Sequence, residues 1–166
     1  LSVLAMSAPA LAAPGLACSA TTGASTIPLV ELYTSEGCDS CPPADRWLRS
    51  TFAPQAGAAR ASVLAFHVDY WDSLGWRDRF ADPAYARRQQ AMVRAAGGHT
   101  SYTPQLLVQG RDRGLWRSGA ISEVLDDLAR TKAKARITLS AQEQADAIVV
   151  DMKAEVPGMR TSDLVA

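Results

Sequence analysis

The sequence predicts an α/β fold in which helices cover a central sheet, followed by a β-rich C-terminal segment. Two apolar runs predict strands. Leu29–Thr34 is apolar on both faces except at Glu31, as expected of a central strand covered by helices, and the unbroken run Ser62–Val68 is expected to be a parallel strand. The segment between them has helical spacing, so the three predict a strand–helix–strand unit. After Lys134 the pattern changes to that of strands, which predicts the second segment. The chain has 166 residues, enough for one domain and an extension.

The first helix is predicted to follow two cysteines in the stretch VELYTSEGCDSCPP, residues 30–43. Pro43 suits the first helical position, because the N–H that proline lacks would have no partner there. The helix is expected to end near Pro54–Gly57. Its inner face recurs at helical spacing and comprises Trp47, Leu48, Thr51 and Phe52.

A second helix is predicted from Asp82-Pro83, which has the pattern of an N-cap followed by the first helical residue. The helical spacing continues until Gly97-Gly98 ends it. Tyr102-Thr103-Pro104 then leads into a strand predicted over Gln105–Gln109.

A short hairpin and a third helix are expected next. The hairpin turn is placed at Gly110–Gly114 and its antiparallel partner at Leu115–Arg117. Ser118 is expected to cap the helix. The inner face of this helix is the clearest amphipathic stretch of the chain and comprises Ile121, Val124, Leu125, Leu128 and Ala129.

The β-rich segment is predicted to occupy residues 135–166. Two strands, Ala135–Leu139 and Ala147–Ala154, flank a polar connection, and Pro157-Gly158 has the pattern of a turn. No stop signal precedes Ala166, so we expect that this segment continues beyond the given sequence.

The N-terminal residues resemble a targeting segment. Residues 1–12 carry no charge and end in Ala10-Leu11-Ala12, which is typical of the end of a secretory signal, and 13–28 read as a flexible lead-in. The apolar run is too short for a membrane span. The mature chain is therefore expected to be periplasmic or secreted, without a membrane span. Cys18 raises the alternative of a lipoprotein, although Gly15 does not fit that pattern.

The composition argues against several partners and cofactors. Seventeen basic residues balance seventeen acidic ones without a tract of like charge, so neither nucleic acid nor an anionic membrane surface is an expected partner. The chain contains neither G-x-G-x-x-G nor a Walker motif, so no bound organic cofactor is expected.

Cys38 and Cys41 form a C-x-x-C pair between a predicted strand and a predicted helix. This arrangement is typical of a thiol–disulfide redox site, because free N–H groups and the dipole at a helix start favour a thiolate. Three alternatives remain open. In the first, the pair forms a static disulfide in a binding module. In the second, it belongs to a four-ligand metal site, although the chain has no second C-x-x-C to complete the ligands. In the third, it holds Cu(I) together with His99 or Met92.

Two acidic side chains are candidates for tuning these cysteines. Glu31 lies in a strand predicted to be buried, where it either relays protons for Cys41 or is satisfied by an arginine or by backbone. Asp39 lies between the cysteines, where it either raises the pKa of Cys38 by repulsion or is an ordinary acid at a helix start.

Histidines and aromatic residues near the predicted strand ends have less specific interpretations. His67 and His99 fit packing or surface positions better than ligand positions. Trp71, Trp76 and Phe80 belong to an aromatic-rich loop over 69–80. They are expected either to cover the core or to form an apolar rim for an unfolded substrate.

Three stretches, VELYTSEGCDSCPPAD, AFHVDYWDSLGWRDRFADP and YTPQLLVQG, resemble recurring segments of the domain-of-unknown-function 1223 family, a group of exported bacterial proteins. The first and third, with the order β-α-β, helix, X-Pro, β-β-α over about residues 29–132, also resemble the thioredoxin superfamily. The resemblance implies a three-layer thioredoxin-like domain over 29–134 that exchanges disulfides with protein substrates and depends on an unnamed redox partner.

The same resemblance implies roles for individual residues. Cys38 would be the exposed attacking thiol, and Cys41 the resolving thiol that closes the Cys38–Cys41 disulfide. Thr103-Pro104 would be a substrate-binding loop with a cis peptide bond that faces this disulfide.

Three departures from the superfamily pattern are visible. Gly37 precedes Cys38 where the superfamily has tryptophan. The superfamily's buried acid would align near Leu32, one place from Glu31. Cys41 precedes a proline, which disfavours helical dihedrals and leaves it in the turn if the helix starts at Pro43.

Overall fold

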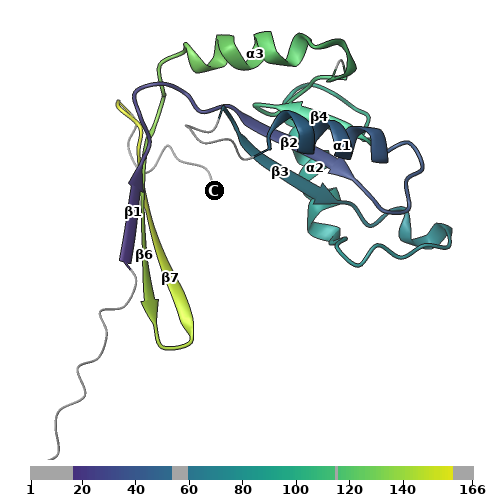
Figure 1. Cartoon of the computed structure of the whole chain (residues 1–166), viewed down its shortest axis with the longest axis horizontal. Helices are drawn as coiled ribbons and strands as arrows, with labels where there is room; N and C mark the ends of the chain where they lie inside the picture. The colour runs from purple at the N-terminus through teal and green to yellow at the C-terminus, as the bar shows by residue number, and fades with distance from the viewer. Residues whose placement is uncertain (1–16, 54–59, 115, 159–166) are drawn as a thin grey trace, which may run out of the picture. The chain divides into compact units, whose positions relative to one another are not determined.

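The computed structural model describes residues 17–53, 60–114 and 116–158, and within them it is a mixed α/β protein with two sheets and three α-helices (Figure 1). The chain divides into two compact units. One comprises residues 24–133, and the other comprises residues 1–23 and 134–166. Each unit is described by itself below.

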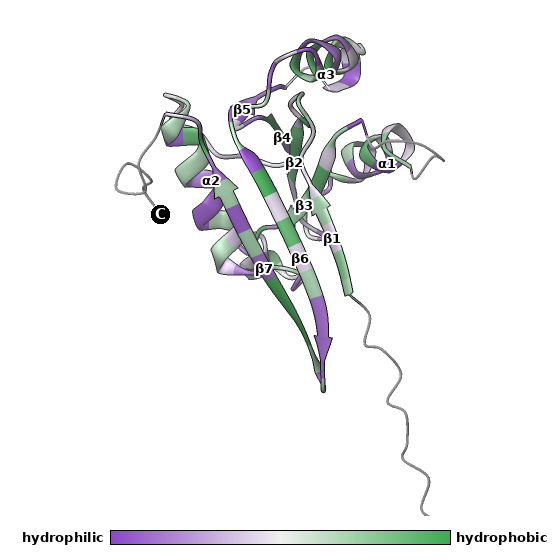
Figure 2. Cartoon of the chain, turned by 90° about the vertical axis from the view of Figure 1, so that its left-hand side faces the viewer, coloured by the Kyte–Doolittle hydropathy of each residue, from purple (hydrophilic) through white to green (hydrophobic). Residues whose placement is uncertain are grey.

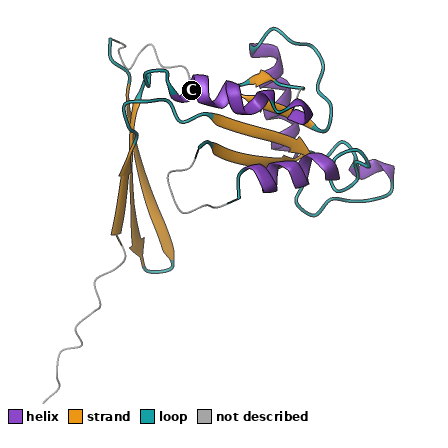
Figure 3. Cartoon of the chain, turned by 45° about the horizontal axis from the view of Figure 1, so that its top comes forward, coloured by secondary structure: helices purple, strands orange, loops and turns teal. Residues whose placement is uncertain are grey.

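The unit of residues 24–133 contains a four-stranded sheet with the order β3-β2-β4-β5. β2 (Leu29–Thr34) pairs in parallel with β3 (Ser62–His67) and antiparallel with β4 (Gln105–Val108). α1 (Pro42–Thr51) connects β2 to β3, which confirms the predicted strand–helix–strand unit (Figure 3).

Helices cover both faces of this sheet. α1 and α3 (Ala120–Ala129) pack on one face, where Val30 and Leu32 of β2 join their core. α2 (Pro83–Ala95) packs on the other face, where Tyr33 meets Ala86. Figure 2 shows α2 on one side of β2, β3 and β4, and α1 on the other. β2 therefore buries both of its faces, which explains why its sequence is apolar on both faces except at Glu31.

The helix starts follow the local sequence with two differences. The Asp82 side chain accepts a hydrogen bond from the Ala84 N–H at 2.7 Å, so the predicted N-cap is confirmed. α1 begins at Pro42 rather than Pro43, and Cys41 is its N-cap with helical dihedrals (φ −76°, ψ −38°). The Cys41 carbonyl accepts the first hydrogen bonds of the helix from Ala44 and Asp45, which favours this conformation. The cap of α3 is Gly119 (φ +76°), not Ser118.

The hairpin after β4 is tighter than the sequence predicted. Gln109 (φ +49°) and Gly110 (φ +71°) form a two-residue turn, and the partner strand is β5 (Arg111–Asp112). Positive φ at both turn positions matches the twist of an antiparallel pair, so no longer loop is required. The predicted partner over 115–117 is therefore wrong. Leu115 lies outside the described residues, and Trp116–Ser118 form a 3-10 helix.

The second unit contains a three-stranded antiparallel sheet with the order β1-β6-β7. β6 (Arg136–Gln144) and β7 (Ala147–Glu155) confirm the two C-terminal strands and extend them, and Pro157-Gly158 forms the expected turn. β1 (Ala17–Thr21) corrects the lead-in, because it pairs along β6 instead of being irregular. The predicted signal over 1–12 lies outside the described residues.

No helix among the described residues has both the length and the apolar character that crossing a membrane requires.

Candidate functional site

The centre of the candidate site is a disulfide between Cys38 and Cys41, in the turn that joins β2 to α1. The turn is closed by hydrogen bonds from the Cys38 N–H to the Ser35 carbonyl and from the Cys41 N–H to the Cys38 carbonyl. Both cysteines are buried, with exposed fractions of 1% for Cys38 and 0% for Cys41. The expectation of an exposed Cys38 is therefore wrong for this oxidised form.

Thr103-Pro104 lies at the same end of the sheet as the disulfide. β2 and β4 are antiparallel, with Tyr33 opposite Gln105. The turn that follows β2 and the loop that precedes β4 are consequently neighbours. The peptide bond between Thr103 and Pro104 is cis, as predicted.

Trp71, in the aromatic loop 69–80, connects these two segments. Its indole Nε1–H donates a hydrogen bond to the Thr103 hydroxyl at 2.8 Å. On its other side, a Cβ placed on Gly37 would lie 3.2 Å from the Trp71 Cβ and 3.4 Å from the Trp76 carbonyl oxygen. This close approach gives a physical reason for glycine immediately before Cys38.

Asp78 fastens the aromatic loop to the turn and to β3. Its side chain is fully buried and accepts hydrogen bonds from the Glu36 N–H (2.8 Å), the Phe80 N–H (2.9 Å) and the His67 Nδ1–H (2.6 Å). Burial acts to raise the Asp78 pKa, but these donors and the charge of His67 together lower the pKa below its usual 3.8. The carboxylate therefore holds together β3, the aromatic loop and the residue that precedes Gly37.

Sequence reasoning missed Asp78, and it gave His67 only a packing or surface role. The signal was present in AFHVDYWDSLGWRDRFADP, since the resemblance of this stretch to a family segment gives no physical explanation of its residues by itself. The contacts of Trp71 and Asp78 supply one, since both fix the loop beside the disulfide turn. Trp76 and Phe80 are 62% and 53% exposed, so these two rings face solvent, whereas Trp71 packs inward. Of the three aromatic residues, only Trp71 therefore covers the core.

Glu31 is satisfied by an arginine. Its Oε1 accepts hydrogen bonds from Arg88 Nε (2.8 Å) and Nη2 (2.6 Å), and the Tyr33 hydroxyl lies 3.5 Å away. The side chain points to the face covered by α2, since Glu31 alternates with Val30 and Leu32 along β2. Cys41 begins the helix on the opposite face. The structure therefore agrees with the prediction that an arginine satisfies Glu31. It does not place Glu31 on the same face of the sheet as Cys41, as a proton relay would require.

Asp45 is the carboxyl that shares a helix with Cys41. It lies four residues later on α1, so both side chains project from the same side of the helix. Burial raises the Asp45 pKa above its usual value, and the neighbouring Thr34 hydroxyl and the charges of His67, Arg49 and Arg46 oppose this. The Thr34 hydroxyl makes no hydrogen bond of ordinary length, so this carboxyl is poorly compensated.

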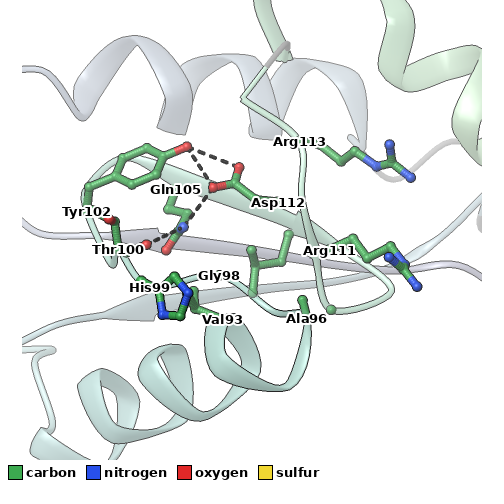
Figure 4. A pocket seen from close by; sticks show the side chains of 12 residues that line it. Val93, Ala96, Gly98, His99, Thr100, Tyr102, Gln105, Arg111, Asp112 and Arg113 are labelled. Atoms are coloured by element: carbon green, nitrogen blue, oxygen red, sulfur yellow. Dashed lines mark hydrogen bonds between the residues drawn. The ribbon is translucent and has the colours of Figure 1, made fainter.

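A polar network on the α2 face holds the segment that contains Thr103-Pro104 through a hydrogen bond to the preceding residue, Tyr102. The buried Gln89 side chain donates to the Tyr102 carbonyl at 2.8 Å and to Gln105 Oε1 at 2.7 Å. Gln105 donates in turn to Asp112, which also accepts from the Tyr102 hydroxyl (Figure 4). Burial, followed by the contact with Asp112, raises the Tyr102 pKa to about 12. This network lines a cavity of about 470 Å³.

The copper ligand set is not assembled. His99 lines the cavity of Figure 4, and Met92 packs against the buried cluster on the α2 face. Across the parts of the chain that the structure describes, no three His, Cys, Asp or Glu side chains are grouped for a metal ion. Cys18 is exposed on β1 and unbonded.

Comparison with known proteins places the chain in a family and beside one solved structure. The profile of the family described as "Protein of unknown function (DUF1223)" matches residues 29–165. A crystal structure of a protein from Agrobacterium tumefaciens is similar, with 26% identity and a TM-score of 0.56 over 80% of this chain and 74% of the other. No curated protein matches. The chain belongs to the DUF1223 family of proteins of unknown function.

Proposed function

We propose that this protein is an exported thiol–disulfide oxidoreductase with a thioredoxin-like domain over residues 29–134, acting on protein substrates through Cys38 and Cys41. The observation that carries the proposal is the placement of the disulfide at the end of β2, beside the loop that contains Thr103-Pro104. The element order β2-α1-β3-α2-β4-β5-α3 and the strand order β3-β2-β4-β5 support the thioredoxin-like architecture.

The exchange needs only the two sulfurs and a substrate dithiol. A substrate thiolate attacks the Cys38 sulfur, the Cys38–Cys41 bond breaks, and Cys41 leaves as a thiolate. The second substrate thiolate then attacks the substrate sulfur of the mixed disulfide and releases Cys38. The substrate loses two electrons to form its disulfide, and the protein gains them as two thiolates. The reverse sequence reduces a substrate disulfide, and an external redox partner sets the direction.

Cys38 is the better candidate for attack because of its place in the turn. Cys38 precedes Asp39 and Ser40, which are exposed. Cys41, in contrast, is the N-cap of α1 and has no exposed surface. A smaller rearrangement therefore uncovers the Cys38 sulfur. Thr103 is proposed to bind the substrate backbone as an added strand, next to the attacked sulfur.

Asp45 takes the proton role that the sequence had assigned to Glu31. Cys41 must lose a proton when it closes the disulfide and gain one when it opens. A half-buried carboxyl with a raised pKa, on the same side of α1, suits this transfer. Glu31 does not suit it, because Arg88 holds its charge on the opposite face.

Trapping of mixed disulfides tests the proposal. The Cys41→Ser variant is expected to accumulate a covalent adduct with a peptide that contains a disulfide, detected by mass spectrometry, because no resolving thiol remains. Cys38→Ser is expected to form none, and Cys18→Ser serves as the control with wild-type exchange. Equal, adduct-free loss in both variants of the pair would contradict these roles.

Burial of both sulfurs favours a second candidate, a binding module in which the disulfide is purely structural. In that case, reduction lowers the stability of the protein, and no variant forms adducts. The reduction potential separates the two, since structural disulfides lie below about −300 mV.

A further inference from the structure

We propose that Trp71 is a specificity-determining residue of this site, and that its contacts with Gly37 and Thr103 set the spacing of the disulfide turn and the Thr103 segment against which an extended polypeptide binds. This inference rests on the proposed exchange reaction. It adds that the aromatic loop selects polypeptide substrates over small thiols.

The position of Trp71 supports this role from two sides. Its Cβ lies against Gly37, next to Cys38, and a Cβ placed on Gly37 would lie only 3.2 Å from it. Its indole N–H meanwhile holds the Thr103 hydroxyl at 2.8 Å. One side chain therefore spans the two segments between which a substrate strand would pass, and its orientation determines their spacing.

Both ends of this arrangement are anchored. Asp78 ties the aromatic loop to Glu36 and His67 through a fully buried carboxylate. On the other side, the buried Gln89 side chain donates to the Tyr102 carbonyl, directly before Thr103. The Tyr70 hydroxyl of the loop also donates to Gln89 Oε1, at 3.4 Å, so the Trp71–Thr103 hydrogen bond is the shorter and more direct of two links between the loop and the Thr103 segment.

This geometry distinguishes two kinds of substrate. A small dithiol needs only to reach the Cys38 sulfur, whereas a polypeptide must also lie along Thr103 while its sulfur reacts. A change in the Trp71–Thr103 contact should therefore slow exchange with polypeptides more than exchange with small thiols. A purely structural role for Trp71 would slow both together and leave their ratio unchanged.

A double-mutant cycle tests the proposal. Trp71→Phe and Thr103→Val each remove one side of the hydrogen bond and keep most of the volume. The measured quantity is the ratio of the exchange rate with an extended peptide dithiol, rich in apolar residues, to the rate with dithiothreitol. Each variant is expected to lower this ratio about tenfold, and the double variant by about the same tenfold, because one shared contact is lost.

The matched control is Trp76→Phe in the same loop. Trp76 also donates through its indole N–H, to Glu36 Oε2 at 3.2 Å, but it is 62% exposed. Its ratio is expected to stay within about twofold of wild type, since an exposed hydrogen bond contributes little. Circular dichroism spectra of all variants check that each is folded. Gly37→Ala provides an independent perturbation, because the added Cβ pushes directly on Trp71, and it is expected to lower the ratio as well.

The outcomes separate the two claims. Unchanged ratios in a wild-type-active protein, or additive losses in the double variant, overturn the role of Trp71 and leave the exchange function standing. A wild-type protein that exchanges with neither the peptide nor dithiothreitol overturns the exchange function itself.

Discussion

The two faces of the central sheet treat an acidic side chain in opposite ways. On the α2 face, Glu31 is fully buried, but Arg88 pairs with it through two hydrogen bonds. On the α1 face, Asp45 is half-buried and has only weak compensation from its neighbours, so burial raises its pKa. A carboxylate that is paired with an arginine keeps its charge when buried, whereas a carboxyl with weak compensation holds its proton to a higher pH than usual. The comparison supports the proposal that Glu31 has a structural role and that Asp45 takes part in the exchange reaction.

The largest expected effect comes from breaking the compensated pair. Arg88→Met leaves the Glu31 carboxylate buried without its partner, and Glu31 Oε2 already has no hydrogen bond. The free energy of unfolding should fall by about 3 kcal/mol. Urea denaturation measures the loss. The double variant Arg88→Met with Glu31→Gln should recover part of this loss, and a fully additive double variant would contradict the pairing.

Asp78 is a buried carboxylate of the compensated kind, and it ties the aromatic loop in place. Asp78→Ala removes one acceptor shared by three donors, so the free energy of unfolding should fall by about 2 kcal/mol. Because its folded pKa is lowered, its stabilising contribution is present above pH 3.8 and is lost as the pH falls through the folded value. Unfolding curves of Asp78→Ala and of wild type between pH 2 and pH 7 check the pH dependence. An equal acid sensitivity in Asp78→Ala and in wild type would count against it.

Asp45→Asn should affect the rate of exchange rather than the fold. Loss of the proton acceptor beside Cys41 is expected to slow closure of the disulfide about tenfold at neutral pH. Stopped-flow measurement of the resolving step gives this rate. Glu31→Gln combined with Arg88→Met, which alters the other carboxyl, should leave the rate of the folded protein within about twofold. A larger loss in that control than in Asp45→Asn would reverse the assignment.

The smallest expected effect is on the stability of the same variant. The raised pKa means that the Asp45 contribution is present below its usual value of 3.8 and is lost as the pH rises through the folded pKa. Asp45→Asn should therefore be slightly more stable than wild type at pH 7 and no more stable at pH 3. Thermal melting at the two pH values shows the difference, and a lower melting temperature at pH 7 would contradict it.

The sequence predicted those parts of the fold that depend on local signals. The strands β2, β3, β6 and β7 and the Asp82 cap all appear in the structure, although β3 is an edge strand whose side chains are exposed or only partly buried. Features that depend on partners distant in the sequence were not predictable. The small and polar residues of β1 indicate an irregular lead-in, and only pairing with β6 makes them a strand. Nothing in the sequence around Glu31 identifies its partner as Arg88, which is 57 residues away.

The candidate site was predictable to the same extent. The Cys38–Cys41 disulfide was one of the interpretations of the C-x-x-C pair, and the cis bond before Pro104 was implied by the resemblance to the thioredoxin superfamily. The contributions of Trp71 and Asp78 did not, because their meaning arises only when the loop folds back onto Gly37 and Thr103. The burial of Cys38 likewise results from tertiary packing, which a reading of its neighbours in sequence could not supply.

The reduction potential of the Cys38–Cys41 pair tests the central claim most directly. Equilibration with glutathione or dithiothreitol redox buffers, followed by alkylation of free thiols and mass spectrometry, measures it. A redox-active pair should have a reduction potential between about −120 and −270 mV, which is the range of known thiol–disulfide oxidoreductases. A potential below about −300 mV would show that the disulfide is a structural staple and would contradict the proposed function.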